Sequence, residues 1–158
     1  MDFTFDDNTH AQVLKLRHFI KNELQPLEDE VEAKGVLDSK TAFEIFEKSR
    51  SLGFYGMNIP TEYGGGGFNA VQMVYLEQEM GQTTDPLIRR AFGNVYEVLL
   101  ACNEAQQQQW LLPCVRGART CSIAMTEPGA GSDSASIKAT AKPDGDGWIL
   151  NAHKCPVG

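Results

Sequence analysis

The 158-residue sequence lacks a long hydrophobic run, an excess of basic residues and any signal-like N-terminus. No apolar stretch approaches the roughly 20 residues that span a bilayer, so no membrane span is expected. The formal net charge of −7 disfavours nucleic acid and anionic membranes as partners, because each requires a basic face. The acidic start, MDFTFDDNTH, resembles neither a secretory signal nor a transit peptide. Cytoplasm is the expected compartment, with the mitochondrial matrix as the alternative if a presequence has been removed.

Cysteine is also scarce, and its spacing forms no recognisable pattern. The four cysteines are Cys102, Cys114, Cys121 and Cys155. They form no C-x-x-C pair and have no matched histidine spacing, so a zinc site is not expected. A disulfide framework would be unusual in a chain of this length. We therefore predict four free and mostly buried thiols.

The first part of the chain shows helical periodicity. Apolar residues at 13, 16, 20, 24, 27 and 31 recur every three or four positions, which is typical of one amphipathic helix face. Pro26 is expected to kink or divide this helix near Gln25, because proline lacks an N–H and clashes with the preceding turn. Gly35 is a natural stop.

A second helix is predicted from Asp38, a favourable N-cap, to about Leu52, with Gly53 as its stop. This helix is expected to bury Phe43, Phe46 and Leu52. Four consecutive glycines, 64–67, then predict a loop. A phosphate cradle in this loop is disfavoured, because no Lys or Ser/Thr follows as in a P-loop.

Three further helices are predicted. Asn69 is expected to cap one that ends near Met80. Asp85-Pro86 opens another, because proline is favoured in the first turn; it is expected to bury Ile88, Phe92, Val95, Leu99 and Cys102. Arg89 and Arg90 near its start could meet an acidic ligand group, although solvated charges are the favoured interpretation.

The last of these helices is predicted to begin at Asn103, with Gln106 in the position of a capping-box partner. Pro113 and Gly117 are expected to end the helical part. The composition then changes to short β-type runs. We therefore expect a helical domain over 1–117 and the beginning of a β-type domain over 118–158.

The β-type part begins with an apolar, strand-like run over 121–126, followed by a turn over 127–133. Two further strand-like segments, 136–141 and 148–154, predict a hairpin. In the turn, Pro128 fixes φ, while Gly129 and Gly131 permit positive φ and close backbone approach. Such a turn can cradle a phosphate or serve as a plain connection. A Rossmann-type site is disfavoured, because a strand rather than a helix follows the glycines.

Two motifs in this part carry a family resemblance. The run A-M-T-E-P-G-A-G-S-D, followed by G-W-I-L-N-x-x-K, resembles the acyl-CoA dehydrogenase flavoprotein family. The earlier G-x-x-x-P-x-x-Y-G-G resembles an architectural loop of that family. The resemblance implies an α+β fold, with an all-α N-terminal bundle followed by the first strands of an antiparallel β-barrel or sandwich. The helix after Asp85 resembles one that walls the acyl pocket.

The resemblance also implies an activity, FAD-dependent α,β-dehydrogenation of an acyl-CoA thioester. Ile123, Ala124, Met125 and Thr126 would then line the flavin, with Met125 acting through its backbone and Thr126 through its hydroxyl. The FAD pyrophosphate would lie near two further residues, Gly131 and Ser132. Ser132 would also contact the CoA part of the substrate.

The family's catalytic base is implied to lie in a C-terminal helical domain that has no counterpart here. No catalytic residue is assigned in this chain, and Glu127 is not taken as the base. We therefore expect a truncated chain with little or no activity of its own. The end, Cys155-Pro156-Val157-Gly158, also departs from the strand that continues the family motif.

The implied partners are an acyl-CoA substrate and an electron-transfer flavoprotein or similar acceptor, and full-length relatives are expected to be homo-oligomers. Two alternatives stay open. One is a related flavoprotein, such as an acyl-CoA oxidase or a flavin monooxygenase component. The other is a non-catalytic fragment that binds a partner through its unfinished sheet edge.

Overall fold

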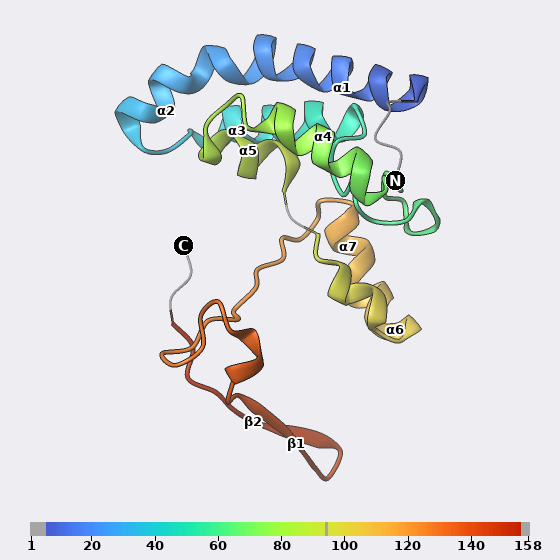
Figure 1. Ribbon diagram of the computed structural model, residues 1–158, viewed down its shortest axis with the longest axis vertical. Helices are drawn as coiled ribbons and strands as arrows, with labels where there is room; N and C mark the ends of the chain where they lie inside the picture. The colour runs from blue at the N-terminus through green and yellow to red at the C-terminus, as the bar shows by residue number, and fades with distance from the viewer. Residues whose placement is uncertain (1–5, 94, 156–158) are drawn as a thin grey trace. The chain divides into compact units, whose positions relative to one another are not determined.

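The computed structural model describes residues 6–93 and 95–155 (Figure 1). The chain divides into two compact units between Cys121 and Ser122, which we call the helical unit and the hairpin unit. The first is built of helices, and the second contains a two-stranded antiparallel sheet. The predicted α+β order of a helical bundle followed by antiparallel strands is confirmed. No helix among the described residues is long and apolar enough to cross a bilayer.

The helical unit opens with a long rod of four consecutive helical segments. They are α1 (Asp7–Phe19), a π-helical turn (Ile20–Leu24), a 3-10 turn (Gln25–Leu27) and α2 (Glu28–Lys34). The irregular turns surround Pro26, which cannot donate a hydrogen bond. The N–H of Gln25 reaches back five residues to the carbonyl of Ile20. The predicted interruption is confirmed, and Gly35 ends the rod with a φ of 70°.

Helix α3 (Ser39–Ser51) begins at its predicted cap. The Asp38 carboxylate accepts the N–H groups of Lys40 and Thr41, both at 3.0 Å. Gly53 follows the helix with a φ of 80°, which confirms the predicted stop.

The predicted burial of Phe43 is wrong. Its side chain is 62% exposed, while Ile45 and Ser49 form the buried face of α3. Phe43 lies two residues before Ile45, which places it about 200° around the helix. Phe46 and Leu52, which were also predicted to be buried, are partly buried and pack against the two apolar clusters.

The glycine-rich loop folds on itself. Its four N–H groups, from Gly64 to Gly67, each donate to a backbone carbonyl, at 2.8–3.2 Å. No N–H remains for a phosphate, so the loop is architectural. Gly65 is required for steric reasons, because a Cβ there would lie 2.1 Å from the carbonyl oxygen of Ile59. A 3-10 turn, Thr61–Tyr63, lies within the loop.

Helix α4 (Ala70–Met80) confirms the third predicted helix. Asn69 and Gln72 form a reciprocal capping box, with both hydrogen bonds at 3.0 Å. The helix packs against α1, and the carboxylate of Glu79 receives a bidentate ion pair from Arg17 at 2.6 and 2.8 Å.

Helix α5 (Asp85–Phe92) is shorter than predicted. The prediction of one helix to Cys102 is wrong, because the chain leaves the helix at Gly93 with a φ of 57°. A Cβ at Gly93 would lie 2.3 Å from the ring of Tyr55. A separate 3-10 segment, Glu97–Ala101, follows.

The last helix is continuous but irregular. Its segments are α6 (Glu104–Gln106), a π-helical turn (Gln107–Leu111) and α7 (Leu112–Val115). The predicted capping box of Asn103 and Gln106 is present. Pro113 lies inside α7 rather than at the end of the helix, because the π-turn before it accommodates the missing N–H. Gly117 marks the end with a φ of 72°.

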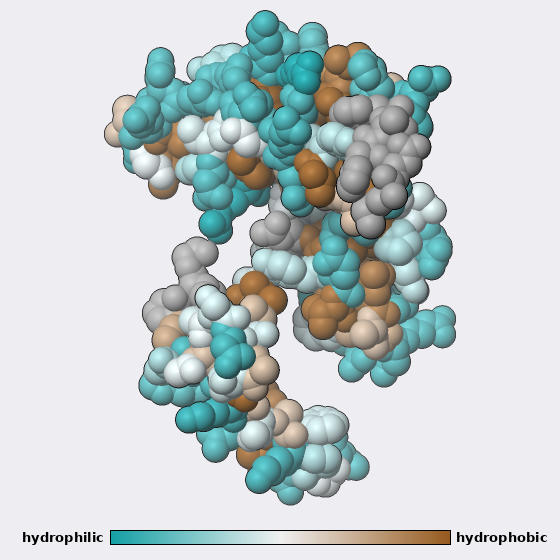
Figure 2. Space-filling model, in the orientation of Figure 1, coloured by the Kyte–Doolittle hydropathy of each residue, from teal (hydrophilic) through white to brown (hydrophobic). Residues whose placement is uncertain are grey.

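Two apolar clusters hold the helical unit together. In the larger cluster, the rod packs over α3, α4 and α5 (Figure 1). Its fully buried side chains include Leu16, Leu24, Phe54, Leu76 and Leu87. The smaller cluster gathers around α7 and contains Tyr55, Ile59, Val95, Leu111, Cys114 and Val115. The outer face of the rod is mostly hydrophilic (Figure 2), as expected for amphipathic helices.

The hairpin unit has little core. Strands β1 (Thr140–Asp144) and β2 (Gly147–Asn151) pair antiparallel, with Ala141 opposite Leu150. Both are exposed along their whole length. The predicted hairpin therefore forms, although its first strand begins four residues later than expected, after a 3-10 turn at Ser134–Ser136. The run over 122–126 is in no strand.

Candidate functional site

The candidate site is the stretch from Ser122 to Cys155, which forms the described part of the hairpin unit. Its first residues, 122–126, follow an irregular path. The side chains of Ile123 and Met125 are 48% and 47% exposed. An apolar strip of this kind offers a flat ligand a surface to pack on.

Glu127 is the central anchor of this unit. Its side chain is almost fully buried, and its carboxylate accepts the N–H groups of Lys138 and Ala139 at 2.8 and 3.0 Å. The Nζ of Lys154 donates a third bond at 2.9 Å. The hydrogen bond from the Lys138 N–H, with the Lys154 ammonium second, holds the pKa of the Glu127 carboxyl below its ordinary value.

The same lysine connects the two ends of the unit. Lys154 Nζ also donates to the carbonyl of Met125 at 3.0 Å. The neighbouring N–H of Cys155 donates to the carbonyl of Thr126 at 3.0 Å. Residues 125–127 are therefore fixed against 154–155 by one ion pair and two hydrogen bonds.

The turn after Glu127 closes through two backbone hydrogen bonds between Glu127 and Ala130, both at 3.1 Å. Neither Gly129 nor Gly131 adopts a positive φ, so that part of the sequence interpretation is wrong. A Cβ at either glycine would meet no atom within 4 Å. The backbone of the turn is thus open to close approach.

The carboxylate of Asp133 shapes the end of this turn. It accepts the N–H of Ala135 at 3.2 Å and the hydroxyl of Ser136. Glu127, Asp133 and Lys154 therefore all have structural partners, as the architectural interpretation of these charged residues requires.

Several hydrogen-bond donors in the site are unused. Among the described residues, no partner is present for the N–H groups of Ile123, Ala124 and Met125. The same holds for the N–H and hydroxyl of Ser132 and for the N–H of Gly131. These residues are exposed, so the donors are accessible to a ligand.

The structure places the six candidate cofactor residues on two short stretches, 123–126 and 131–132, on either side of the Glu127 turn. This arrangement fits a flavin nucleotide in two respects. The unused N–H donors suit the acceptor-rich edge of an isoalloxazine and the oxygens of a pyrophosphate. The exposed side chains of Ile123 and Met125 suit the apolar face of the ring.

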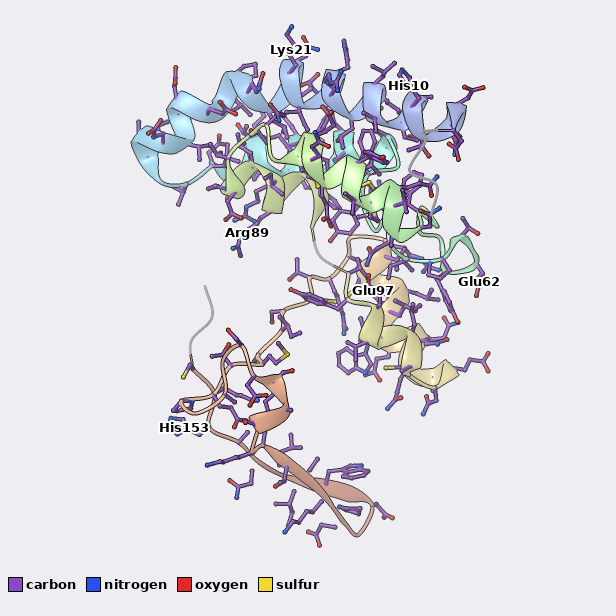
Figure 3. All side chains as sticks on the ribbon, in the orientation of Figure 1. His10, Lys21, Glu62, Arg89, Glu97 and His153 are labelled. Carbon is purple, nitrogen blue, oxygen red and sulfur yellow. The ribbon has the colours of Figure 1, made fainter. Side chains whose placement is uncertain are left out.

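The helical unit carries a second feature, an open groove of about 860 Å³. Its walls come from α4, α5 and the segment after α5. Its apolar lining includes Met73, Val74, Met80, Ile88 and Phe92. Glu97 lies at this groove and accepts a hydrogen bond from Asn58 (Figure 3).

The sequence did not identify these lining residues. Two weaker signals were available: the resemblance of the helix after Asp85 to one that walls the acyl pocket, and a surplus of apolar positions on α4, whose Val74 is 62% exposed. Arg89, considered as a ligand contact, pairs with Asp85 one turn earlier at 2.7 Å and is exposed to solvent (Figure 3). No cluster of three or more His, Cys, Asp or Glu suited to a metal occurs within 6–93 and 95–155.

Comparison with known proteins gives consistent matches. The family model described as "Acyl-CoA dehydrogenase, N-terminal domain" matches residues 7–118. A 3-(aryl)acrylate reductase from Clostridium sporogenes is 32% identical over 161 aligned residues, which cover 95% of this chain. The chain spans 40% of the length of that relative.

Two of the solved structures that match this chain are acyl-CoA dehydrogenases, in agreement with the matching family model. An acyl-CoA dehydrogenase from Geobacillus kaustophilus matches with a TM-score of 0.71 and 30% identity, covering 95% of this chain and 39% of that one. An acyl-CoA dehydrogenase from Bacillus anthracis, in complex with FAD, matches with a TM-score of 0.72 and 25% identity. That match covers 95% of this chain and 26% of the other.

Proposed function

Since the chain belongs to the acyl-CoA dehydrogenase family, we propose that it contributes the flavin edge and the acyl wall of an FAD-dependent acyl-CoA dehydrogenase. The reaction would be the removal of hydrogen from the α and β carbons of an acyl-CoA thioester. The observation that carries the proposal is the row of unused N–H donors over 123–125, held in place by Glu127 and Lys154. The FAD complex of the Bacillus anthracis relative supports the choice of cofactor.

Each candidate residue has a role in this proposal. The N–H groups of Ile123, Ala124 and Met125 would hold the polar edge of the flavin, and the Thr126 hydroxyl would add a further donor. Gly131 and Ser132 would bind the pyrophosphate, and Ser132 would also contact the CoA moiety. When bound, FAD supplies the two-electron acceptor, while the protein orients the substrate and stabilises developing charge.

The groove in the helical unit suits the acyl part of the substrate. Its walls are apolar methionine, valine, isoleucine and phenylalanine side chains, which favour burial of a hydrocarbon chain. The acidic Glu97 and the amide of Asn58 would mark its polar end.

No described residue is proposed as the base that removes the α-proton. Glu127 is unsuited to this role, because three donors already occupy its carboxylate and its pKa is lowered. A general base requires a pKa near the working pH and a free lone pair. The proposal therefore assigns binding and orientation, but no proton transfer, to these residues.

A second candidate function is the reverse reaction, reduction of an α,β-unsaturated substrate. It is favoured by the similarity to a 3-(aryl)acrylate reductase over 95% of the chain. Both directions use the same flavin edge. In either case we expect an electron-transfer flavoprotein or a similar redox partner, and a homo-oligomeric assembly.

Titration of the 158-residue chain with FAD, followed by flavin fluorescence, tests the proposal. Ser132→Ala should weaken FAD binding about 2- to 10-fold, which corresponds to the loss of one hydrogen bond. Ser134→Ala is the matched control, because Ser134 is also exposed and lies two residues away. The Ser134→Ala variant should bind FAD with the affinity of the wild type.

Two results would contradict the proposal. The first is that the wild-type chain leaves the flavin signal unchanged at every concentration. The second is that the two serine variants bind FAD equally well.

A further inference from the structure

Two of the four cysteines lie against each other in the helical unit. The sulfur atoms of Cys114, in α7, and Cys121, the last residue of the helical unit, are 3.1 Å apart. Six residues separate them in sequence, and the chain reverses between them at Gly117, where φ is 72°. Sequence spacing gave no indication of this contact, because C-x₆-C matches no common motif.

The two thiols differ in access to solvent. Cys114 is 5% exposed and belongs to the smaller apolar cluster, while Cys121 packs on the edge of that cluster and is half-buried. A small reagent can therefore reach Cys121 but not Cys114. This asymmetry is typical of a dithiol in which one sulfur reacts first and the other resolves the product.

The charged and titratable groups around the pair also favour reaction of Cys121 before Cys114. Burial, and then the hydrogen bond with Cys121, raise the pKa of the Cys114 thiol to about 11. The positive charge of Arg119 acts in the opposite direction on Cys114. Tyr55 also faces the pair, and burial raises the pKa of its hydroxyl, so it stays neutral. Cys114 is thus the protonated and buried member of the pair, and Cys121 is the member that an external reagent can reach.

We propose that Cys114 and Cys121 form a redox-active dithiol that closes on reaction with a low-molecular-weight disulfide. The Cys121 thiolate attacks one sulfur of the external disulfide, whose S–S bond breaks and releases one thiolate. Cys114 then loses its proton and attacks the Cys121 sulfur, and the second thiol leaves. The two protein thiols are oxidised, and the external disulfide is reduced to two thiols.

Closure would have a definite structural effect. It would tie the C-terminal end of α7 to the residue from which the chain continues into 122–126. The segment that carries the unused N–H donors would then begin from a covalently fixed point. This inference rests on the thiol geometry and does not depend on flavin binding.

Oxidised glutathione is the probe for the experiment. The purified chain is incubated with it, free thiols are alkylated, and tryptic peptides are identified by mass spectrometry. Cleavage after Arg116 and Arg119 separates the two cysteines, so closure appears as a disulfide-linked pair of peptides. The intact protein should be two hydrogens lighter, without a glutathione adduct.

Three variants identify the bond. Cys102 shares a tryptic peptide with Cys114, so Cys102→Ser must still give the linked pair. Cys114→Ala should stop at a glutathione adduct on Cys121, and Cys121→Ala should leave Cys114 unmodified. Closure in the wild type should accelerate as the pH rises, because more Cys114 is then ionised.

Three outcomes would overturn the inference. The wild type could stop at a stable glutathione adduct on Cys121. The link could join Cys102 to Cys121, which the Cys102→Ser variant would reveal by losing it. Finally, Cys121 could react no faster than Cys102 and Cys155 and form no link.

Discussion

Glu127 determines the geometry of the hairpin unit at the scale of single residues. Its carboxylate gathers two backbone N–H groups and one ammonium from positions 11, 12 and 27 residues later in the chain. Only Glu127 and Ala130 are buried among the described residues of this unit. The hydrogen bonds and the ion pair of Glu127 therefore stabilise the hairpin unit, whereas apolar clusters stabilise the helical unit.

Glu127→Gln should loosen this anchor, because a neutral amide loses the ion pair with Lys154. The carboxyl pKa is lowered in the folded chain, so its stabilising contribution is present above the ordinary value of 4.5. That contribution is lost as the pH falls through the lowered pKa. The amide chemical shifts of Lys138 and Ala139 should follow this titration in the wild type and stay constant in the variant.

The exposed Glu104→Gln is a suitable control for this titration, and it should leave the pH dependence of both amides unchanged. If these amides show no titration in the wild type, or titrate identically in Glu127→Gln, the anchor does not exist as described.

Sequence reasoning reached part of this result. The run T-E-P-G predicted a turn, because proline and glycine act locally. It did not show that the glutamate side chain turns inward, since its partners lie in a different part of the chain. The contact of Cys114 with Cys121 was missed for a related reason: it depends on the chain reversal at Gly117.

At the scale of elements, helix beginnings were predicted well and helix ends less well. Asp38, Asn69 and Asn103 all cap helices as their sequences indicate, because capping depends on residues within one turn. The end of α5 was missed, because Gly93 acts through Tyr55, which is distant in sequence. Local chemistry is visible in a sequence, whereas a close approach between elements is not.

The capping box at Asn103 gives a prediction at this scale. Asn103→Ala removes the acceptor of the Gln106 N–H and should lower the free energy of unfolding by about 1 kcal/mol. Asn103→Ser retains a capping oxygen and should cost much less. Urea unfolding measures both: the midpoint should decrease in the alanine variant while the slope stays constant.

An unchanged midpoint in Asn103→Ala would contradict this prediction. It would mean that the α6–α7 helix is held by its packing against the smaller apolar cluster alone. Equal losses in the alanine and serine variants would instead point to an effect other than capping.

Two of the prolines in helical segments, Pro26 and Pro113, show how a π-turn can extend an element. Each is preceded by a π-helical turn, over Ile20–Leu24 and Gln107–Leu111. The turn allows the helix direction to continue although one N–H is missing. The interruption predicted at Pro26 is present as these irregular turns, whereas the end predicted near Pro113 is wrong, because α7 continues to Val115.

At the scale of the whole molecule, the two units differ in how they are stabilised. The helical unit has two apolar clusters, whereas the hairpin unit exposes both strands and leaves Trp148, Ile149 and Leu150 largely in contact with solvent. The order of elements and the family resemblance were available from the sequence. The near absence of a core in the hairpin unit was not, because the apolar run Trp148–Leu150 has the same sequence whether or not another surface covers it.

The thin core of the hairpin unit has a calorimetric consequence. The heat capacity of unfolding reports mainly apolar surface that becomes hydrated, and an exposed hairpin has little left to hydrate. Scanning calorimetry should therefore give about 1.6 kcal/mol/K, as for the 121 residues of the helical unit, rather than about 2.1 for 158 residues. A heat capacity of unfolding that rises with protein concentration toward the larger value would show that the hairpin buries apolar surface only when chains associate. The heat capacity of thermal unfolding is therefore expected to be that of a shorter chain.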